Sequence, residues 1–196
     1  MLQNAQQSNL LLDPLPESVK IDGTEVEIDT DFRTSIRFAL LMQNRRIDDR
    51  TKLELALYMF YGDAIPLNTN AAVDAILWFY RCGKESESRG TAKGGAARAY
   101  DFEEDAGLIY AAFWQQYGID LQTAQLHWWQ FRALFSGLTK DTEIMTIAGY
   151  RTAEITSDMP KSEQTRYRKL KEMYALKDNR TEEEKERDFA ANLAML

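Results

Sequence analysis

The residues able to take part in nucleophilic or acid–base catalysis are few and isolated in this sequence. The chain of 196 residues contains one histidine, His127, and one cysteine, Cys82. A catalytic triad needs its histidine beside a serine or cysteine and an orienting carboxylate. His127 instead lies in the aromatic sequence LHWW, and Cys82 ends the apolar segment WFYRCG. We therefore interpret His127 as a packed structural histidine and Cys82 as a buried, unreactive thiol.

A run of carboxylates, Glu103, Glu104 and Asp105, could bind a metal ion or act as acid and base. Adjacent residues of a helix point in different directions, however, and negative charge in a first turn is stabilised by exposed N–H groups. The run therefore favours a solvated helix start over a site. One cysteine and one histidine also cannot supply the ligands of a structural zinc site. We expect no catalytic residues, no metal and no cofactor, and hence a protein that is not an enzyme.

The composition is that of a globular chain with an acidic balance. Apolar residues make up 44% and charged residues 28% of the sequence, and the formal net charge is −7. No run reaches the roughly 18 apolar residues of a membrane-spanning helix, and the N-terminus lacks the features of a secretory signal. A negative charge disfavours nucleic acid as a partner, because such binding relies on neutralising phosphates. We expect a cytoplasmic protein that contacts no membrane.

Hydrophobic periodicity predicts a mainly α fold, a compact multi-helix domain with a small N-terminal β-hairpin and a C-terminal helical extension. Val19 and Ile21 alternate with polar residues before the Asp22-Gly23 pair, and Val26 and Ile28 alternate after it. Such a pair between alternating runs is a strong hairpin signal. Capping residues predict seven further helices, which begin at Thr30 or Asp31, at Asp48 or Asp49, at Asn68 or Asn70, near Asp101, near Thr123, at Asp141 and at Pro160.

The chain divides into three parts by composition. Residues 1–9 are polar, and we expect them to be disordered. Residues 10–177 form the helical domain, interrupted at 84–98 by a charged, glycine-rich segment that predicts a mobile loop. Residues 178–196 predict a linker and then an amphipathic helix, which opens with a capping box at Thr181.

Two adjacent helices carry an aromatic cluster that includes Trp114. In the second of them, Trp128, Phe131 and Phe135 share one face by their spacing and are expected in the core. Trp129 lies off that face, so this helix is apolar on almost every side. It is either central in the fold or contacts a partner on its second side. Trp114 and Trp129 are therefore candidate partner-binding residues.

Two further segments are candidate surfaces. Residues 161–171 carry five basic residues, with Arg166 and Lys169 among them. A nucleic-acid helix is conceivable, but the net charge favours an exposed face, or one that meets an acidic partner or the chain's own acidic stretch at 13–31. The helix after 181 places three apolar residues on one side, and it either docks on a partner or packs back on its own domain. These three residues are Phe189, Leu193 and Leu196.

Several stretches, in the same order over about residues 10–177, resemble the Gp15-type family of long-tailed bacteriophages. They include DAILWFYRCGKE, YDFEEDAGLIYAAFWQQYGIDL, LHWWQFRALFSGL and YRKLKEMYAL, and the opening LLLDPLPESVKIDGTEVEIDTDF is similar to the start of that family. The helix expected after 181 is not covered by the resemblance.

The resemblance implies a protein encoded between the major tail protein and the tape-measure protein, which is the position of tail assembly chaperones. Its partners would be the tape-measure protein and the major tail protein, in the host cytoplasm, and it could form a homo-oligomer. No catalytic residues are carried over by the resemblance. The alternative is a structural virion component, such as a head–tail connector or tail-completion protein.

Overall fold

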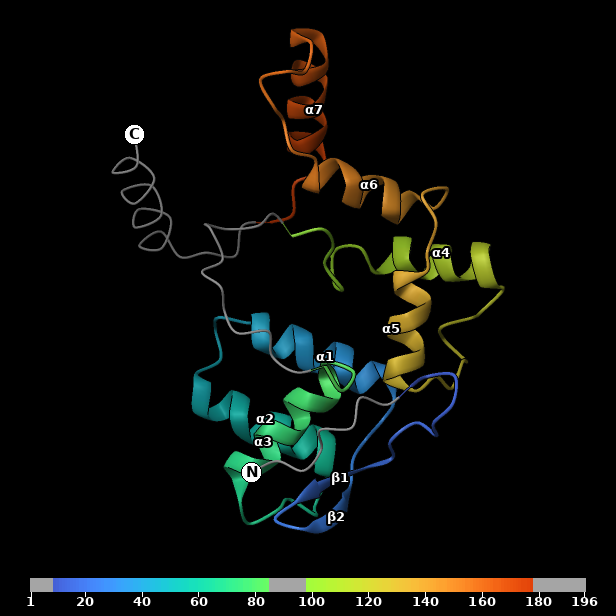
Figure 1. Cartoon of the computed structure of the whole chain (residues 1–196). Coiled ribbons are helices and arrows are strands. Elements are labelled where there is room, and N and C mark those ends of the chain that lie inside the picture. Colours follow the sequence, from blue (N-terminus) through green and yellow to red (C-terminus); the bar gives the residue numbers. More distant parts are fainter. Residues whose placement is uncertain (1–8, 85–97, 178–196) are drawn as a thin grey trace.

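The computed structural model of the chain describes residues 9–84 and 98–177 (Figure 1). The elements of this described part are β1 (Ser18–Ile21), β2 (Thr24–Glu27), α1 (Phe32–Gln43), α2 (Asp49–Tyr61), α3 (Thr69–Tyr80), α4 (Ala106–Tyr117), α5 (Trp128–Ser136), α6 (Glu143–Thr152) and α7 (Lys161–Met173). The prediction of a mainly α fold with an N-terminal hairpin is therefore confirmed. The parts expected at 1–9, 84–98 and 178–196 lie, apart from their edge residues, outside the described ranges.

The hairpin forms where the sequence predicts it. Asp22 and Gly23 both adopt positive φ, 50° and 82°, as a two-residue turn that follows the twist of its strands requires. Val19 lies opposite Val26 in the antiparallel register. Val19 and Ile21 are buried, and β1 packs on α3. A lone hairpin is marginal in water, so this contact with the helical body is what stabilises it.

The first three helices begin at capping side chains that the sequence identifies. Asp31, Asp48 and Asn68 each accept a hydrogen bond from a backbone N–H in the first turn of α1, α2 and α3, at 2.7, 3.0 and 3.2 Å. Each bond satisfies one of the N–H groups that a helix start leaves without a partner. In each case the structure selects one of the two neighbouring candidates.

Helix α4 begins later than the sequence predicts, at Ala106 rather than near Asp101. The side chain of Asp101 accepts hydrogen bonds from the backbone N–H groups of Glu103 and Glu104, at 2.8 and 3.1 Å. The side chain of Asp105 in turn accepts one from the N–H of Asp101, at 2.9 Å. These local bonds replace helical hydrogen bonds, so residues 101–105 form a turn ahead of the helix.

Helix α5 also begins later, at Trp128 instead of near Thr123. The preceding backbone is extended and pairs with the segment that leads into α1. The N–H of Trp128 donates to the carbonyl of Thr30 at 2.8 Å, and the N–H of Phe32 donates to the carbonyl of Leu126 at 3.1 Å. This pairing comes from residues about a hundred positions earlier, and helical periodicity contains no sign of it.

The start of α6 corrects a smaller prediction. Thr142, and not Asp141, precedes the helix, and it makes no side-chain capping bond. Its hydroxyl donates to the carbonyl of Thr139 at 2.8 Å and is buried. Helix α7 begins at Lys161, one residue after the predicted start at Pro160, which is its N-cap.

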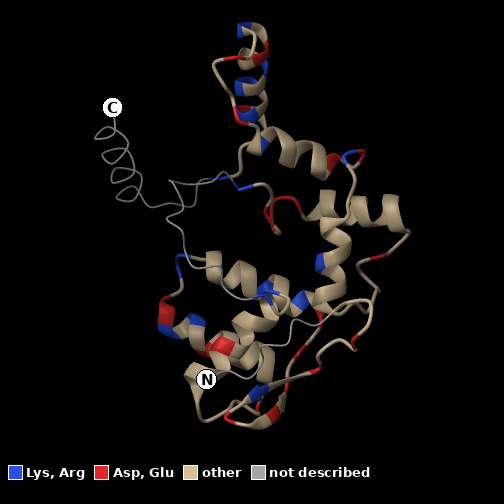
Figure 2. Ribbon diagram, viewed as in Figure 1, with Lys and Arg blue, Asp and Glu red and all other residues tan. Residues whose placement is uncertain are grey.

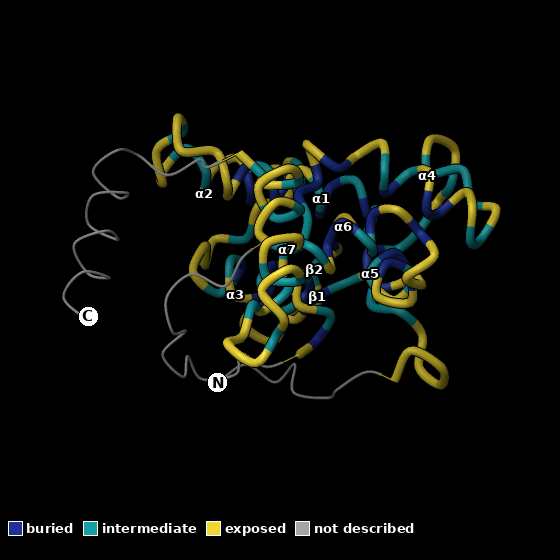
Figure 3. Tube along the Cα trace, turned by 90° about the horizontal axis from the view of Figure 1, so that it is seen from above, coloured by how far each residue is buried: buried dark blue, intermediate teal, exposed yellow. Residues whose placement is uncertain are grey.

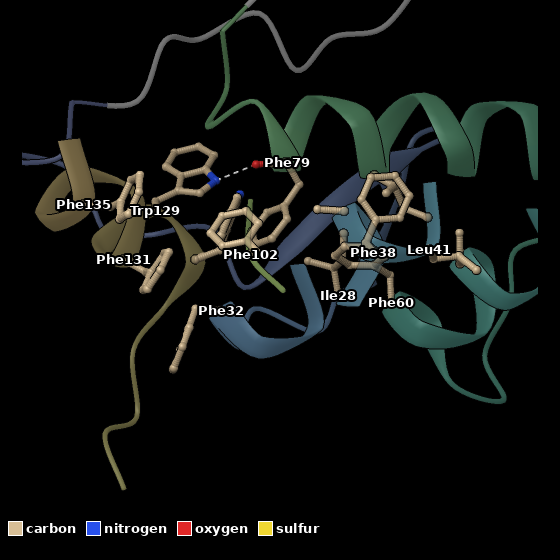
Figure 4. Packing of buried hydrophobic residues seen from close by; sticks show 14 of the residues in the cluster. Ile28, Phe32, Phe38, Leu41, Phe60, Phe79, Phe102, Trp129, Phe131 and Phe135 are labelled. Carbon is tan, nitrogen blue, oxygen red and sulfur yellow. Dashed lines mark hydrogen bonds between the residues drawn. The ribbon is translucent and has the colours of Figure 1, made fainter. Parts of the chain in front are cut away.

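Stacked aromatic rings fill the centre of the core (Figure 4). Phe131 of α5 is fully buried, and its ring stacks on Phe32 of α1 at 4.9 Å and on Phe113 of α4 at 5.0 Å between ring centroids. Trp128 and Phe135 stack on the same ring from within α5. The predicted core face of α5 is thereby confirmed, and α5 is the helix on which α1 and α4 meet.

The elements are arranged in two groups joined by α5 (Figure 1). The hairpin and α1, α2 and α3 form one group, while α4, α6 and α7 form the other, with α4 packed on α6 and α6 on α7. The view from above shows buried residues along the inner sides of the helices and an exposed α7 (Figure 3). Helix α7 and the hairpin lie at opposite ends of the molecule.

His127 is the N-cap of α5 and links this helix to the segment that precedes the hairpin. Its Nδ1 accepts a hydrogen bond from the N–H of Trp129 at 3.0 Å, which leaves the proton on Nε2 to donate to the carbonyl of Pro16, also at 3.0 Å. The side chain of Gln130 completes the capping box by accepting from the N–H of His127. Burial lowers the pKa of His127 below its ordinary value of 6.5. The interpretation of a packed structural histidine agrees with these contacts.

We expect the stability of the protein to fall as the pH falls through the ordinary histidine pKa. Because the pKa of His127 is lowered in the folded state, the unfolded state binds the proton at a higher pH, and protonation favours unfolding. Protonation also removes the Nδ1 acceptor that caps α5. Urea unfolding at about pH 7.5 and about pH 5.5 measures the change in midpoint. His127→Asn keeps a capping acceptor without titrating, so its midpoint should change less; an equal change in both proteins would contradict the assignment.

Candidate functional site

Helix α4 presents an uncharged face to solvent. Its sequence, AGLIYAAFWQQY, contains no acidic or basic residue. Ile109 and Phe113 point into the core, whereas Gly107, Ala111 and Trp114 are exposed. These three follow one another at spacings of four and three, which places them on one face. A surface helix normally carries charged residues on its solvent side, so α4 departs from that rule.

Trp114 dominates this α4 face. Its side chain is 56% exposed. Beside Gly107 the surface is open, because no neighbouring atom lies within 4 Å of the position that a Cβ would occupy there. The small side chains of Gly107 and Ala111 thus leave a flat area beside a projecting indole. Exposed tryptophans are enriched among the residues that contribute most to protein–protein binding, and small residues let a second helix approach closely. The predicted role of Trp114 is compatible with its position.

Trp129 is a core residue, and its prediction as a partner-binding residue is wrong. It is 4% exposed. Its indole N–H donates to the carbonyl of Phe79 at 2.8 Å (Figure 4). Its ring lies edge-on to that of Trp78. The C-terminal end of α3 therefore covers the second side of α5. Of the two situations that the sequence allows for α5, the structure selects the central helix.

The five basic residues of the segment 161–171 all lie on α7, which is exposed along its length. None of its residues is buried, and Arg166 and Lys169 are exposed. Five Lys or Arg and two Glu give it a net charge of +3. Within the described ranges, neither Arg166 nor Lys169 forms an ion pair. Their charges are therefore available to a partner (Figure 2).

The chain's own acidic stretch does not neutralise α7. The sequence leaves open that residues 13–31 lie against the basic helix. The structure places the hairpin in this stretch at the end of the molecule opposite α7 (Figure 1). An intramolecular contact between the two is therefore excluded in this conformation.

The acidic run before α4 contains a buried ion pair in place of the expected solvated start. Asp105 and Arg151 form two hydrogen bonds, at 2.6 and 3.0 Å, and their side chains are 4% and 9% exposed. The prediction is wrong for Asp105, because residues 101–105 fold as a turn that directs this carboxylate toward α6. Glu103 and Glu104 are exposed as expected.

Arg151 connects the two candidate surfaces. Besides Asp105, its guanidinium donates to the carbonyl of Tyr174 at 2.6 Å and to that of Ala99 at 3.2 Å. The ring of Tyr174 stacks on that of Tyr150 at 5.8 Å. One side chain thus holds the start of α4, the end of α7 and the segment before residue 101.

Cys82 lies among residues that keep its thiol protonated. It follows α3 with φ of 57° and is half-buried. Burial raises the pKa of the Cys82 thiol, and the nearby charge of Arg132 offsets only part of this effect. A reactive cysteine needs a lowered pKa, so the raised pKa agrees with the expected unreactive thiol, whereas the residue is half-buried and not buried as predicted.

The remaining predictions concern metal ions, membranes and the C-terminal residues. In residues 9–84 and 98–177, no group of three or more His, Cys, Asp or Glu could hold a metal ion. None of the helices in these ranges has both the length and the apolar character needed to cross a membrane. Phe189, Leu193 and Leu196 lie outside the described residues.

Leu67 and Met173 are two of several exposed apolar side chains that were not identified from the sequence. Leu67, in the connection between α2 and α3, is fully exposed, and Met173 at the end of α7 is 70% exposed. The exposure of Leu67 could have been predicted from its position between Pro66 and Asn68, in a loop. That of Met173 could have been predicted from its spacing of seven from Arg166 and four from Lys169, which places it on the same exposed stripe.

Comparison with known proteins identifies one family. The model of the family described as bacteriophage Gp15 protein matches residues 11–176. No curated protein and no solved structure matches the chain.

Removal of the Arg151 side chain should destabilise the protein severely. Arg151→Met leaves Asp105 buried without its counter-ion, which costs about 3–5 kcal/mol. Adding Asp105→Asn should recover part of this loss, because the amide is neutral and still accepts from the N–H of Asp101. The exposed pair of Arg50 and Glu54 provides the control: Arg50→Met should cost less than about 1 kcal/mol. Equal urea midpoints for Arg151→Met and Arg50→Met would contradict the role of the buried pair.

Proposed function

The chain belongs to the bacteriophage Gp15 protein family, and we propose from this premise that it is a tail assembly chaperone that binds the tape-measure protein. Family membership alone suggests a structural or head–tail protein of a phage. One observation carries the finer proposal: α4 exposes Trp114 on a helix without a single charged residue. Such a face supports binding of a protein and offers no group for catalysis.

The chemistry of the proposed client matches this α4 face. A tape-measure protein is a long helix with apolar surface that must be kept soluble until the tail tube covers it. An amphipathic helix can lay its apolar stripe along Gly107 and Ala111, with Trp114 filling the space between its side chains. Because the face is small, each site would be weak. Several copies along one client would gain strength by multivalency.

The proposal includes the setting in which the protein acts. The chaperone would hold the tape-measure protein in the host cytoplasm and help major tail protein subunits to assemble around it. It would act without a metal, a cofactor or a catalytic step. Nucleic acid is disfavoured as a partner by the net charge of −7.

The alternative is a structural virion component, which membership of the family by itself suggests. A head–tail connector or tail-completion protein would also need exposed helices for contacts with its neighbours. Mass spectrometry of purified virions separates the two functions, because a chaperone should be absent or strongly depleted from the finished particle. Detection at a fixed copy number in every virion would favour the structural component.

Replacement of Trp114 should abolish client binding without unfolding the protein. Trp114→Glu places a charge in the centre of the α4 face, and loss of a tryptophan anchor typically costs at least about 2 kcal/mol, or roughly 30-fold in affinity. The native chain, co-expressed with the tape-measure protein encoded in the same phage, should keep that protein soluble and co-purify with it. The variant should do neither.

Tyr58→Glu provides the matched control for this experiment. Tyr58 lies on α2 and is 59% exposed, close to the 56% of Trp114. This variant should retain the client, and both variants should give the helical circular dichroism of the native chain. Co-purification of the client with Trp114→Glu, or its equal loss with Tyr58→Glu, would rule out the α4 face as the binding site.

A further inference from the structure

The two ends of the molecule carry opposite charge. Helix α7, at one end, has a net charge of +3. The opposite end carries the hairpin, and residues 13–29 contain six acidic residues and one lysine, a net charge of −5. Figure 2 shows the basic residues along α7 and the acidic residues around the hairpin. The separation follows the long direction of the molecule in Figure 1.

Two charged side chains at each end lack partners within the described part of the chain. On α7, Arg166 and Lys169 are exposed and form no ion pair there. At the hairpin, Glu25 and Glu27 of β2 are likewise exposed and make neither a hydrogen bond nor an ion pair with the described residues. Like charges gathered on one surface repel one another. A partner of opposite charge would therefore stabilise either end.

Each end also exposes an apolar side chain next to its charges. Met173 shares the exposed stripe of α7 with Arg166 and Lys169. At the other end, Leu67 is fully exposed beside the hairpin turn. The following residue, Asn68, holds this loop there by donating to the carboxylate of Asp22 at 2.9 Å. The ends are thus complementary in apolar character as well as in charge.

The arrangement of the fold allows the two ends of different copies to meet. Figure 3 looks down the long direction of the molecule and shows α7 in front of β1 and β2, although Figure 1 places them at opposite ends. A second copy displaced along this direction would bring its hairpin onto α7 of the first with little sideways movement. The same contact could then repeat at each free end.

Helix α7 also has little packing against the described part of the chain. It has 13 residues, none of them buried. Isolated helices of fewer than about 12–15 residues are marginal in water, since most helical stability in proteins comes from packing. Within residues 9–84 and 98–177, α7 packs on α6, and the carbonyl of Tyr174 just beyond its end accepts a bond from Arg151. Contact with a second copy would add to the packing that the described residues give α7.

We propose that the protein associates head to tail, with the basic α7 of one copy on the acidic hairpin end of the next. The interface is heterologous, because a different surface contributes from each copy. Repetition of such a contact gives an open chain, or a ring if the rotation between copies closes. This proposal does not depend on the tape-measure protein, since it concerns the purified chain alone.

Sedimentation velocity over a range of concentrations, at low and at high salt, tests the proposal. The weight-average mass of the native chain should rise with concentration above the 22.6 kDa of one copy, and high salt should reverse the rise. Arg166→Glu with Lys169→Glu should weaken association at least about tenfold, because like charges then face each other. Glu25→Lys with Glu27→Lys should have the same effect. Arg37→Glu with Lys140→Glu, an equal change in charge away from both ends, should associate like the native chain.

Charge exchange makes the experiment specific for this pair of surfaces. An equimolar mixture of the α7 variant and the hairpin variant should associate again, because each reversed end finds an end of opposite charge. A chain that carries all four substitutions should also associate. Recovery of this kind would exclude unfolding as the cause of the loss.

Three results would overturn the proposal. The native chain could remain a monomer at every concentration and salt level, or the mixture of variants could fail to associate. Association could also survive in the hairpin variant but be lost when Glu182, Glu183 and Glu184 are changed to lysine. In that case the acidic C-terminal segment, and not the hairpin, would be the partner of α7.

Discussion

The buried ion pair between Asp105 and Arg151 is the contact on which one half of this molecule depends. Asp105 closes the turn that starts α4, and Arg151 projects from α6 and also holds the carbonyl of Tyr174 beyond the end of α7. Two charges removed from water are tolerated only where the geometry and the further hydrogen bonds are good. Here those bonds are the ones that fix α4 and α7, so the pair determines where both candidate surfaces lie.

The exposed faces of α4 and α7 differ in chemistry, and this suggests that they bind different partners. The α4 face is uncharged and apolar, which suits a helical client, whereas α7 and the hairpin end are charged, which suits contacts between copies. If copies associate head to tail, each repeat presents one α4 face, and Trp114 recurs along the assembly. A row of weak, identical sites matches a long client better than one strong site, because neighbouring sites raise one another's effective concentration.

Local signals in the sequence predicted much of the fold, and long-range contacts account for the errors at Trp129 and Asp105. The turn at Asp22 and the cap of α1 depend on residues within a few positions, so the sequence alone identified the turn and limited the cap to Thr30 or Asp31. The burial of Trp129 depends on the distant end of α3, and the solvation expected for Asp105 was wrong because its partner lies 46 residues away. Neither contact leaves a trace in helical periodicity. Trp114, chosen from the sequence as a candidate binding residue, is exposed in the structure. The small residues Gly107 and Ala111 beside it could be recognised as part of that face only once the exposed side of α4 was known.

The central claim is that the uncharged face of α4 is where this phage protein holds its helical client. Hydrogen–deuterium exchange of the protein, with and without the tape-measure protein, tests it most directly because it locates the contact on the unmodified chain. The account predicts slower exchange over residues 106–117 when the client is present, together with little change in α2. Exchange over residues 106–117 that is unaffected by a client that demonstrably binds would contradict the account, because the binding surface would then lie elsewhere.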